Sequence, residues 1–148
     1  VVLTVSPIRY AKYGFVGSQL SKATLILATH RLLGLLPDCT TYFPAYEIMN
    51  DELRDYRFYA PDMLHPSEQA VEYIWQRFTN VYLSSSAHTF LKEWQPLQAA
   101  LNHKPVNPDS AEYKTFLAKT LQDIRALETK YGHKIDLSAY ESIVKHGE

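Results

Sequence analysis

Apolar side chains recur along the chain at steps of three and four residues, a spacing that predicts mainly helices. The predicted helices span about 22–36, 67–82, 86–103 and 110–131. In the first of these helices the apolar positions lie near one face: Ala23, Ile26, Leu27, His30, Leu33 and Leu36. Residues 7–20 are expected to form a long loop. Residues 46–59 alternate charged and aromatic side chains without a clean period and predict a mixture of irregular helix and loop.

Two short β-rich runs predict strands. Val1–Val5 is almost entirely apolar and is followed by Ser6 and Pro7, a pattern typical of a strand that is buried on both faces. Thr40–Phe43 is the second candidate. A buried strand needs neighbours to pair its backbone groups, and the chain offers few candidates. We therefore expect an α/β fold that has few strands and is dominated by helices.

The last two predicted helices are separated by Pro105 and Pro108, which break the helical pattern between them. Gly132 follows the second of these helices as the expected end residue. Two amphipathic helices joined by a short connection are expected to form an antiparallel hairpin. The sequence thus predicts a division into residues 1–83 and a helical hairpin extension over residues 84–148.

The composition narrows the classes of function. Fifteen basic and sixteen acidic side chains give a net charge of -1, so the sequence does not indicate a nucleic-acid-binding protein. The single cysteine, Cys39, excludes an internal disulfide and a cysteine-based zinc site. The histidines show no metal-ligand spacing, and no cofactor is expected. No apolar run approaches the ~20 residues that a membrane span requires.

Asp62 and His65 form the one arrangement in the sequence that has a catalytic mechanism behind it. They lie between Pro61 and Pro66, so a rigid loop is expected to hold both side chains. A histidine that acts as a general base needs a carboxylate on Nδ1 to fix its tautomer, while Nε2 faces a cleft. The alternative is an aspartate that caps the next helix beside an exposed histidine, because D-x-x-H also occurs by chance.

Two further segments have competing interpretations. Arg54 and Arg57 lie among acidic side chains, and they either position an anionic substrate or form structural ion pairs. Residues 9–19 follow the first predicted strand, where loops at the carboxyl ends of parallel strands border ligand pockets. The aromatic side chains of this segment either contact a substrate or pack among themselves.

Longer stretches of the sequence resemble a known family. The main stretch runs from Tyr42 to Tyr59, continues through Asp62–Ser67 and ends with Ala70–Phe78. Shorter stretches follow the expected order: Thr4–Arg9, Leu20–Leu25, His103–Pro105, Asn107–Pro108 and Tyr113–Leu117. Together these residues, which cover most of the chain, closely resemble the GSCFA family of bacterial proteins, which is related to the SGNH (GDSL-like) hydrolases.

The resemblance implies both a fold and a reaction. SGNH hydrolases have an α/β/α (flavodoxin-like) fold with a parallel sheet, and they cleave esters with a serine nucleophile, a histidine base and an aspartate behind it. Their aspartate and histidine come from one D-x-x-H block before the last helix of the domain, and Asp62 and His65 match that block. By this resemblance, residues 1–83 are the C-terminal part of such a domain, His65 takes the serine proton and Asp62 orients its ring.

The chain departs from the family at the nucleophile. The Gly-Ser-Cys-Phe-Ala segment that gives the family its name is not present, and the blocks that form the oxyanion hole cannot be placed. Ser6 and Ser67 lie near the relevant loops, but neither sits in a nucleophile elbow. The chain is therefore expected to be the C-terminal portion of a longer hydrolase, to carry the Asp–His half of a triad and to be inactive by itself.

Two classes of function stay open. The first is an SGNH-type esterase or acyl-transfer enzyme that acts on a small-molecule or glycan ester, with a carbohydrate or envelope component as the favoured substrate. The second is a non-catalytic interaction module that uses the helical hairpin. A sheet with few strands exposes an edge and apolar helix faces, which favours self-association. The compartment is left open, because the chain begins without an initiator methionine or a targeting segment.

Overall fold

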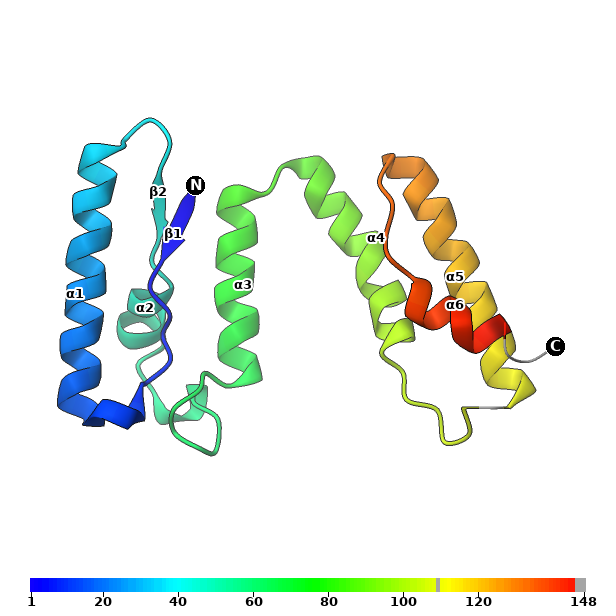
Figure 1. The fold of residues 1–148 in the computed structure, drawn as a ribbon, viewed down its shortest axis with the longest axis horizontal. Helices are drawn as coiled ribbons and strands as arrows, with labels where there is room; N and C mark the ends of the chain where they lie inside the picture. Colours follow the sequence, from blue (N-terminus) through cyan, green and yellow to red (C-terminus); the bar gives the residue numbers. More distant parts are fainter. Residues whose placement is uncertain (109, 146–148) are drawn as a thin grey trace. The chain divides into compact units, whose positions relative to one another are not determined.

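The computed structural model describes residues 1–108 and 110–145 and is dominated by helices, with two parallel strands (Figure 1). The chain divides into two compact units, Val1–Tyr82 and Leu83–Glu148. The first unit contains β1 (Val2–Thr4), η1 (Ala11–Tyr13), α1 (Gly14–Leu35), β2 (Thr41–Phe43), α2 (Ala45–Glu47), η2 (Ile48–Leu53), η3 (Tyr56–Phe58) and α3 (Glu68–Tyr82). The second contains α4 (Ser85–Leu101), α5 (Ala111–Tyr131) and α6 (Ser138–Lys145).

The two strands pair in parallel, with Val2 opposite Thr41 and Thr4 opposite Phe43. Parallel strands need a long crossover connection, and α1 provides it. The prediction that Val1–Val5 is buried on both faces is wrong: Val1 is 82% exposed and Val2 is 42% exposed. The physical reason is that β2 is the only strand paired with β1 within residues 1–108 and 110–145.

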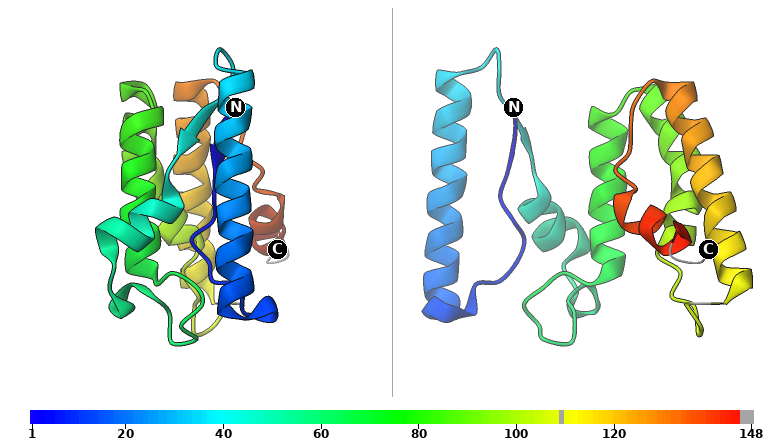
Figure 2. Two further views of the ribbon diagram at one scale, coloured as in Figure 1. Left: turned by 90° about the vertical axis from the view of Figure 1, so that its left-hand side faces the viewer. Right: turned by 45° about the vertical axis from the view of Figure 1, so that its right-hand side comes forward.

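A helix packs on each face of this small sheet. Successive strand residues point to opposite faces. The Tyr42 ring lies 5.8 Å from that of His30 on α1. The Phe43 ring instead lies 5.2 Å from Phe78 of α3, where it joins the buried core of this unit. The strands accordingly lie between α1 and α3 (Figures 1 and 2).

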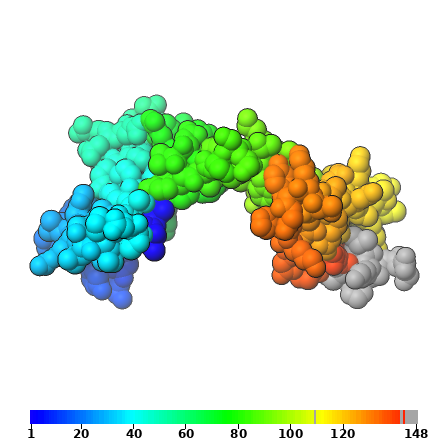
Figure 3. Space-filling view, turned by 90° about the horizontal axis from the view of Figure 1, so that it is seen from above, coloured from blue at the N-terminus to red at the C-terminus, as the bar shows by residue number. Residues whose placement is uncertain are grey.

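Helix α1 is the largest departure from the expected elements. The predicted loop over residues 7–20 is wrong from Gly14 onward, where the helix begins. The helix buries Ser18 and Lys22, whereas Leu27 of its apolar set is 71% exposed, as is the neighbouring Leu35. Figure 3 shows the C-terminal end of this helix, in cyan, at the surface of the unit. The apolar spacing correctly predicts a helix here, but its leucines have no core to enter in the described residues.

The connection from β2 to α3 is irregular, as the alternation of charged and aromatic residues predicts. Helix α2 runs directly into η2, which is π-helical, and η3 is a short 3-10 turn. Arg54 ends η2 with φ 48°, in the left-handed region that residues other than glycine rarely adopt. This stretch follows the carboxyl end of β2 and leads into the loop of the D-x-x-H block.

In the second unit, α4 and α5 lie side by side and run antiparallel (Figures 1 and 2). Their buried core centres on Leu101, Leu117, Ile124 and Leu137, with side chains such as Trp94 packed around it. The Lys130 ammonium of α5 pairs with the Glu93 carboxylate of α4 at 2.6 Å. The sequence pattern did not predict α6, which packs against α5.

Candidate active site

The D-x-x-H block lies on a closed loop between η3 and α3. Tyr59 and Pro66 form an antiparallel bridge, and the Ala60 N–H donates to the His65 carbonyl at 2.8 Å. The Met63 N–H donates back to the Ala60 carbonyl at 2.9 Å, and this turn has Pro61 at its second position, which suits the fixed φ of proline. Backbone hydrogen bonds therefore fix the loop.

Asp62 and His65 are in direct contact on this loop. Asp62 Oδ2 lies 2.5 Å from His65 Nδ1. Asp62 Oδ1 accepts hydrogen bonds from the backbone N–H groups of Leu64 and His65, at 2.9 and 3.0 Å. The predicted meeting of the two side chains is thus present. The alternative role of Asp62 as the cap of the next helix is not observed, because Ser67 Oγ accepts from the Ala70 N–H of α3 instead.

The same hydrogen bonds keep the Asp62 carboxylate ionised. The backbone N–H groups of His65 and Leu64, and then the His65 ring, lower the pKa of Asp62 to about 2. At neutral pH a charged oxygen therefore faces Nδ1, which favours the tautomer that carries its proton there and leaves Nε2 as the basic nitrogen. The His65 side chain is 59% exposed.

Arg9 joins the loop to the segment that follows β1. The Arg9 N–H donates to the Leu64 carbonyl at 3.0 Å, and its guanidinium donates to the Met63 carbonyl at 3.4 Å. The guanidinium carbon also lies 4.0 Å from the centre of the Tyr59 ring, a cation–π contact. Met63 itself has φ 61°, a strained value of the kind that clusters at functional sites. The site thus lies at the carboxyl end of β1, where open α/β sheets bind ligands.

Two cavities border this loop. One, of about 220 Å³, is mainly polar and is lined by Arg9, Met49, Asn50, Arg54, Asp55, Tyr56 and Tyr59. The other, of about 460 Å³, is lined by Arg9, Phe15, Ser18, Gln19, Tyr56 and Met63. The predicted pocket along residues 9–19 is therefore present, although most of that segment is helical. Tyr10 and Tyr13 instead pack against one another, with ring centres 5.0 Å apart. His65 lines neither cavity, so neither of the two cavities forms the cleft that was expected at His65 Nε2.

Neither candidate serine of the chain hydrogen-bonds with His65. Ser67 Oγ caps α3, and Ser6 Oγ accepts from the Ile8 N–H at 3.3 Å. Across residues 1–108 and 110–145, the His65 ring has Asp62 as its hydrogen-bond partner and no serine. The structure thus brings Asp62 and His65 together, while neither Ser6 nor Ser67 is hydrogen-bonded to the ring.

The two arginines with competing interpretations differ from one another. Arg57 forms an ion pair with Asp55 at 3.3 Å, which fits the structural interpretation rather than a role in positioning a substrate. Arg54 has no side-chain partner in the part of the chain that the structure describes, although it lines the polar cavity.

Sequence reasoning did not single out Arg9 as a site residue. The available signal was its position shortly after the first predicted strand, in the segment that follows Ser6 and Pro7.

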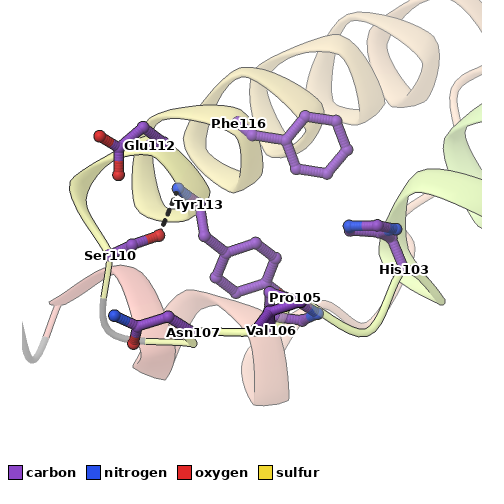
Figure 4. A pocket seen from close by; sticks show the side chains of 8 residues that line it. All are labelled: His103, Pro105, Val106, Asn107, Ser110, Glu112, Tyr113 and Phe116. Atoms are coloured by element: carbon purple, nitrogen blue, oxygen red, sulfur yellow. Dashed lines mark hydrogen bonds between the residues drawn. The ribbon is translucent and has the colours of Figure 1, made fainter.

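The second unit has a cavity of its own, of about 530 Å³ (Figure 4). It lies where the connection after α4 meets the first turns of α5, with His103, Tyr113 and Phe116 around it. Ser110 Oγ accepts from the Tyr113 N–H and begins the helix. Its lining combines apolar rings with few charged groups, so it lacks a catalytic constellation of its own.

No group of three or more histidine, cysteine or acidic side chains within the described ranges is placed to hold a metal ion. In the same ranges, no helix combines the length and apolar character needed to cross a membrane.

The fold and the site define a helix-rich α/β protein with an aspartate–histidine pair at the end of a parallel sheet. The GSCFA family matches residues 1–78, and the family described as GSCFA domain protein, C-terminal domain, matches residues 94–145. The chain therefore belongs to the GSCFA family, which confirms the resemblance of its sequence. No curated protein and no solved structure matches the chain.

Proposed function

We propose that this chain supplies the base half of an SGNH-type serine hydrolase. In this proposal His65 is the general base, Asp62 is its orienting partner, and the serine and the oxyanion hole come from outside these 148 residues. The observation that carries the proposal is the 2.5 Å contact between Asp62 Oδ2 and His65 Nδ1 on a loop fixed by backbone hydrogen bonds.

The geometry of the pair suits one sequence of proton transfers. His65 Nε2 takes the hydroxyl proton as the serine oxygen bonds to the ester carbonyl carbon, and Asp62 stabilises the imidazolium that forms. The imidazolium then gives the proton to the alkoxide that leaves, which yields an alcohol and an acyl-serine. Water cleaves the acyl-serine by the same route, with His65 as base and then as acid, and returns the serine and a carboxylic acid.

Two surface features support a serine that comes from an additional segment. The His65 ring is 59% exposed, whereas a working triad excludes bulk water from its base. The other feature is an apolar cavity of about 490 Å³ between the sheet and α3, with Val2, Phe43 and Trp75 among its lining residues. The α/β/α fold proposed for the whole domain calls for further strands beside β1, and this apolar surface suits them.

The substrate class of the proposal is an ester or acyl group on a small molecule or glycan, with a carbohydrate or envelope component favoured. This part rests on the relation to the SGNH hydrolases that the sequence resemblance implies.

The test is labelling with a fluorophosphonate probe, which reacts with activated serines. It compares the 148-residue chain with the same chain extended upstream to its start codon. We expect only the extended protein to be labelled. His65→Ala should abolish labelling and Asp62→Asn should slow it by about 100-fold or more, in the range that general-base catalysis supplies. His30→Ala is the matched control, because His30 is exposed on α1 of the same unit.

Folding of each variant is checked by circular dichroism before labelling. Equal labelling of His65→Ala and wild type would remove His65 from the mechanism. If neither form is labelled although both are folded, the hydrolase proposal fails. The other class, a binding module that uses the second unit, would then be favoured by the cavity beside Tyr113 and Phe116.

A further inference from the structure

We infer that the polar cavity beside the D-x-x-H loop is a binding site for an oxyanion, a carboxylate or phosphate group, with Arg54 as its main ligand. The inference rests on the proposed function: the ester that the Asp62–His65 site cleaves carries such a group. The cavity holds about 220 Å³. A water molecule occupies about 30 Å³ in the liquid, so this volume suits a small charged group better than a whole glycan.

The charge of the cavity favours an anion. Arg9 and Arg54 both line it, and the single carboxylate in its wall, Asp55, is already paired with Arg57. Asn50 donates its side-chain amide to the Tyr46 carbonyl at 2.7 Å and is thereby held in place. The walls thus include two arginines, a residue type whose guanidinium group is suited to bidentate binding of carboxylate and phosphate.

Arg54 combines the lack of a partner with a place in a cavity wall, whereas Arg31, which also has no partner in the described residues, lines neither of the two cavities beside the loop. Arg57 pairs with Asp55, Arg77 with Glu52, and Arg125 with Glu128. The Arg54 side chain makes no ion pair or hydrogen bond within residues 1–108 and 110–145, although it lines a cavity. A guanidinium in that position is available to a ligand.

The backbone conformation of Arg54 also favours a ligand-binding role. Its φ of 48° is a left-handed conformation that glycine adopts without strain. An arginine at this position keeps a charged side chain at the cost of that strain, as is common at ligand-binding sites.

The cavity is physically connected to the catalytic loop. Arg9 and Tyr56 line both this cavity and the neighbouring one of about 460 Å³. Arg9 also donates hydrogen bonds to Leu64 and Met63, the two residues between Asp62 and His65. An anion held by Arg54 therefore lies beside the loop that carries the base, and the larger cavity has room for the rest of the substrate.

The first test measures binding by the 148-residue chain and needs no catalysis. Isothermal titration and NMR follow the addition of methyl phosphate, monomethyl succinate and the neutral dimethyl succinate. We expect the two anions to bind and the neutral diester not to bind. Their relative affinities distinguish a phosphate from a carboxylate site. Arg54→Gln should weaken anion binding by about tenfold or more, as expected for loss of a charge-assisted contact.

Two further variants control this result. Arg54→Gly suits the left-handed backbone and should fold at least as well as wild type, yet lose the binding. Arg31→Gln removes the same charge from an exposed position on α1, about 18 Å along the helix from Gln19 at 1.5 Å per residue, and should bind normally. Equal affinity of wild type and Arg54→Gln, or no binding of either anion, would overturn the inference.

The second test measures ester cleavage by the protein extended upstream. Arg54→Gln should raise KM for a nitrophenyl ester that carries a carboxylate or phosphate, with kcat retained, and leave a neutral nitrophenyl ester unaffected. Serine labelling without anion binding would sustain the hydrolase and refute this site. Anion binding without serine labelling would sustain the site and refute its link to ester cleavage.

Discussion

Helices α1 and α5 are nearly equal in length, with 22 and 21 residues, yet they are held in place by different forces. Helix α5 buries an apolar face, and Leu117 and Ile124 are fully inaccessible. Helix α1 instead buries Ser18 and Lys22 and leaves Leu27 exposed. The second unit is therefore held by a core of its own, whereas the side chains that α1 buries fully are polar.

Polar contacts of α1 lie at the end of the helix that faces the candidate site. Ser18 Oγ accepts from the Tyr10 N–H, and the Lys22 ammonium donates to the Ser6 carbonyl at 2.5 Å. The Tyr46 hydroxyl donates to Gln19 Oε1 at 2.8 Å. The difference between the helices shows two ways of holding a helix in place. In the first unit, specific hydrogen bonds fix α1 beside the candidate site, whereas in the second unit hydrophobic burial fixes α5.

The largest effect that tests this comparison is expected from a matched pair of leucine truncations. Leu117→Ala removes a fully buried side chain and should lower the free energy of unfolding of the second unit by about 3 kcal/mol, as for other core leucines. Leu27→Ala, at a 71% exposed position of α1, should change the first unit by less than about 0.5 kcal/mol. Native-state hydrogen exchange, read for each unit separately, measures both. A comparable loss from Leu27→Ala would show that α1 has a hydrophobic partner.

The same comparison explains what could be predicted from the sequence. The periodicity of α3 and α5 predicts both helices, because their apolar stripes enter cores that these units themselves form. The start of α1 was missed because Gly14 and Gly17 suggest a loop. Gly14 indeed has φ 71° where η1 ends, but Gly17 lies inside the helix, where an added Cβ would meet Tyr13 Cβ at 2.8 Å. This close approach requires glycine and cannot be recognised before the fold is known.

An intermediate effect is expected from Lys22, whose burial hydrophobic patterning does not predict. Lys22→Ala removes the hydrogen bond to Ser6 and should destabilise the first unit by about 2 kcal/mol, the range for bonds to charged groups. Its control is Lys12→Ala, at an exposed position of η1, with an expected change below about 0.5 kcal/mol. Urea unfolding measures both variants. Equal stability of the two would mean that the buried ammonium is not what attaches α1.

The candidate site was predictable to the extent that its contacts are local. Asp62 and His65 are three residues apart on a proline-bounded loop, so spacing and backbone restriction suffice to bring them together. Arg9 reaches the same loop from more than fifty positions away, and Arg54 is distinguished from Arg57 by its place in the cavity wall and by the absence of a partner in the described residues. Neither fact is encoded in a local pattern, because each depends on how the carboxyl ends of the two strands meet.

The smallest expected effect is confined to the D-x-x-H loop and concerns pH. The pKa of Asp62 is lowered to about 2 in the folded state, against about 3.9 for an unperturbed aspartate. A depressed pKa means that the ionised carboxylate stabilises the folded loop above about pH 4, and that this stabilisation is lost as the pH falls towards 2. NMR titration of the Asp62 carboxyl carbon and of the Leu64 and His65 amides should follow this single transition.

The cause of the shift determines how variants should change it. Because the backbone N–H groups of His65 and Leu64 lower the pKa more than the His65 ring does, His65→Ala should keep the pKa of Asp62 below its ordinary value. A return of that pKa to about 3.9 in His65→Ala would instead show that the ring holds the carboxylate. Asp62→Asn should remove the transition altogether. A pKa of Asp62 that stays low in His65→Ala would mean that the backbone of the loop holds the carboxylate in place independently of the His65 ring.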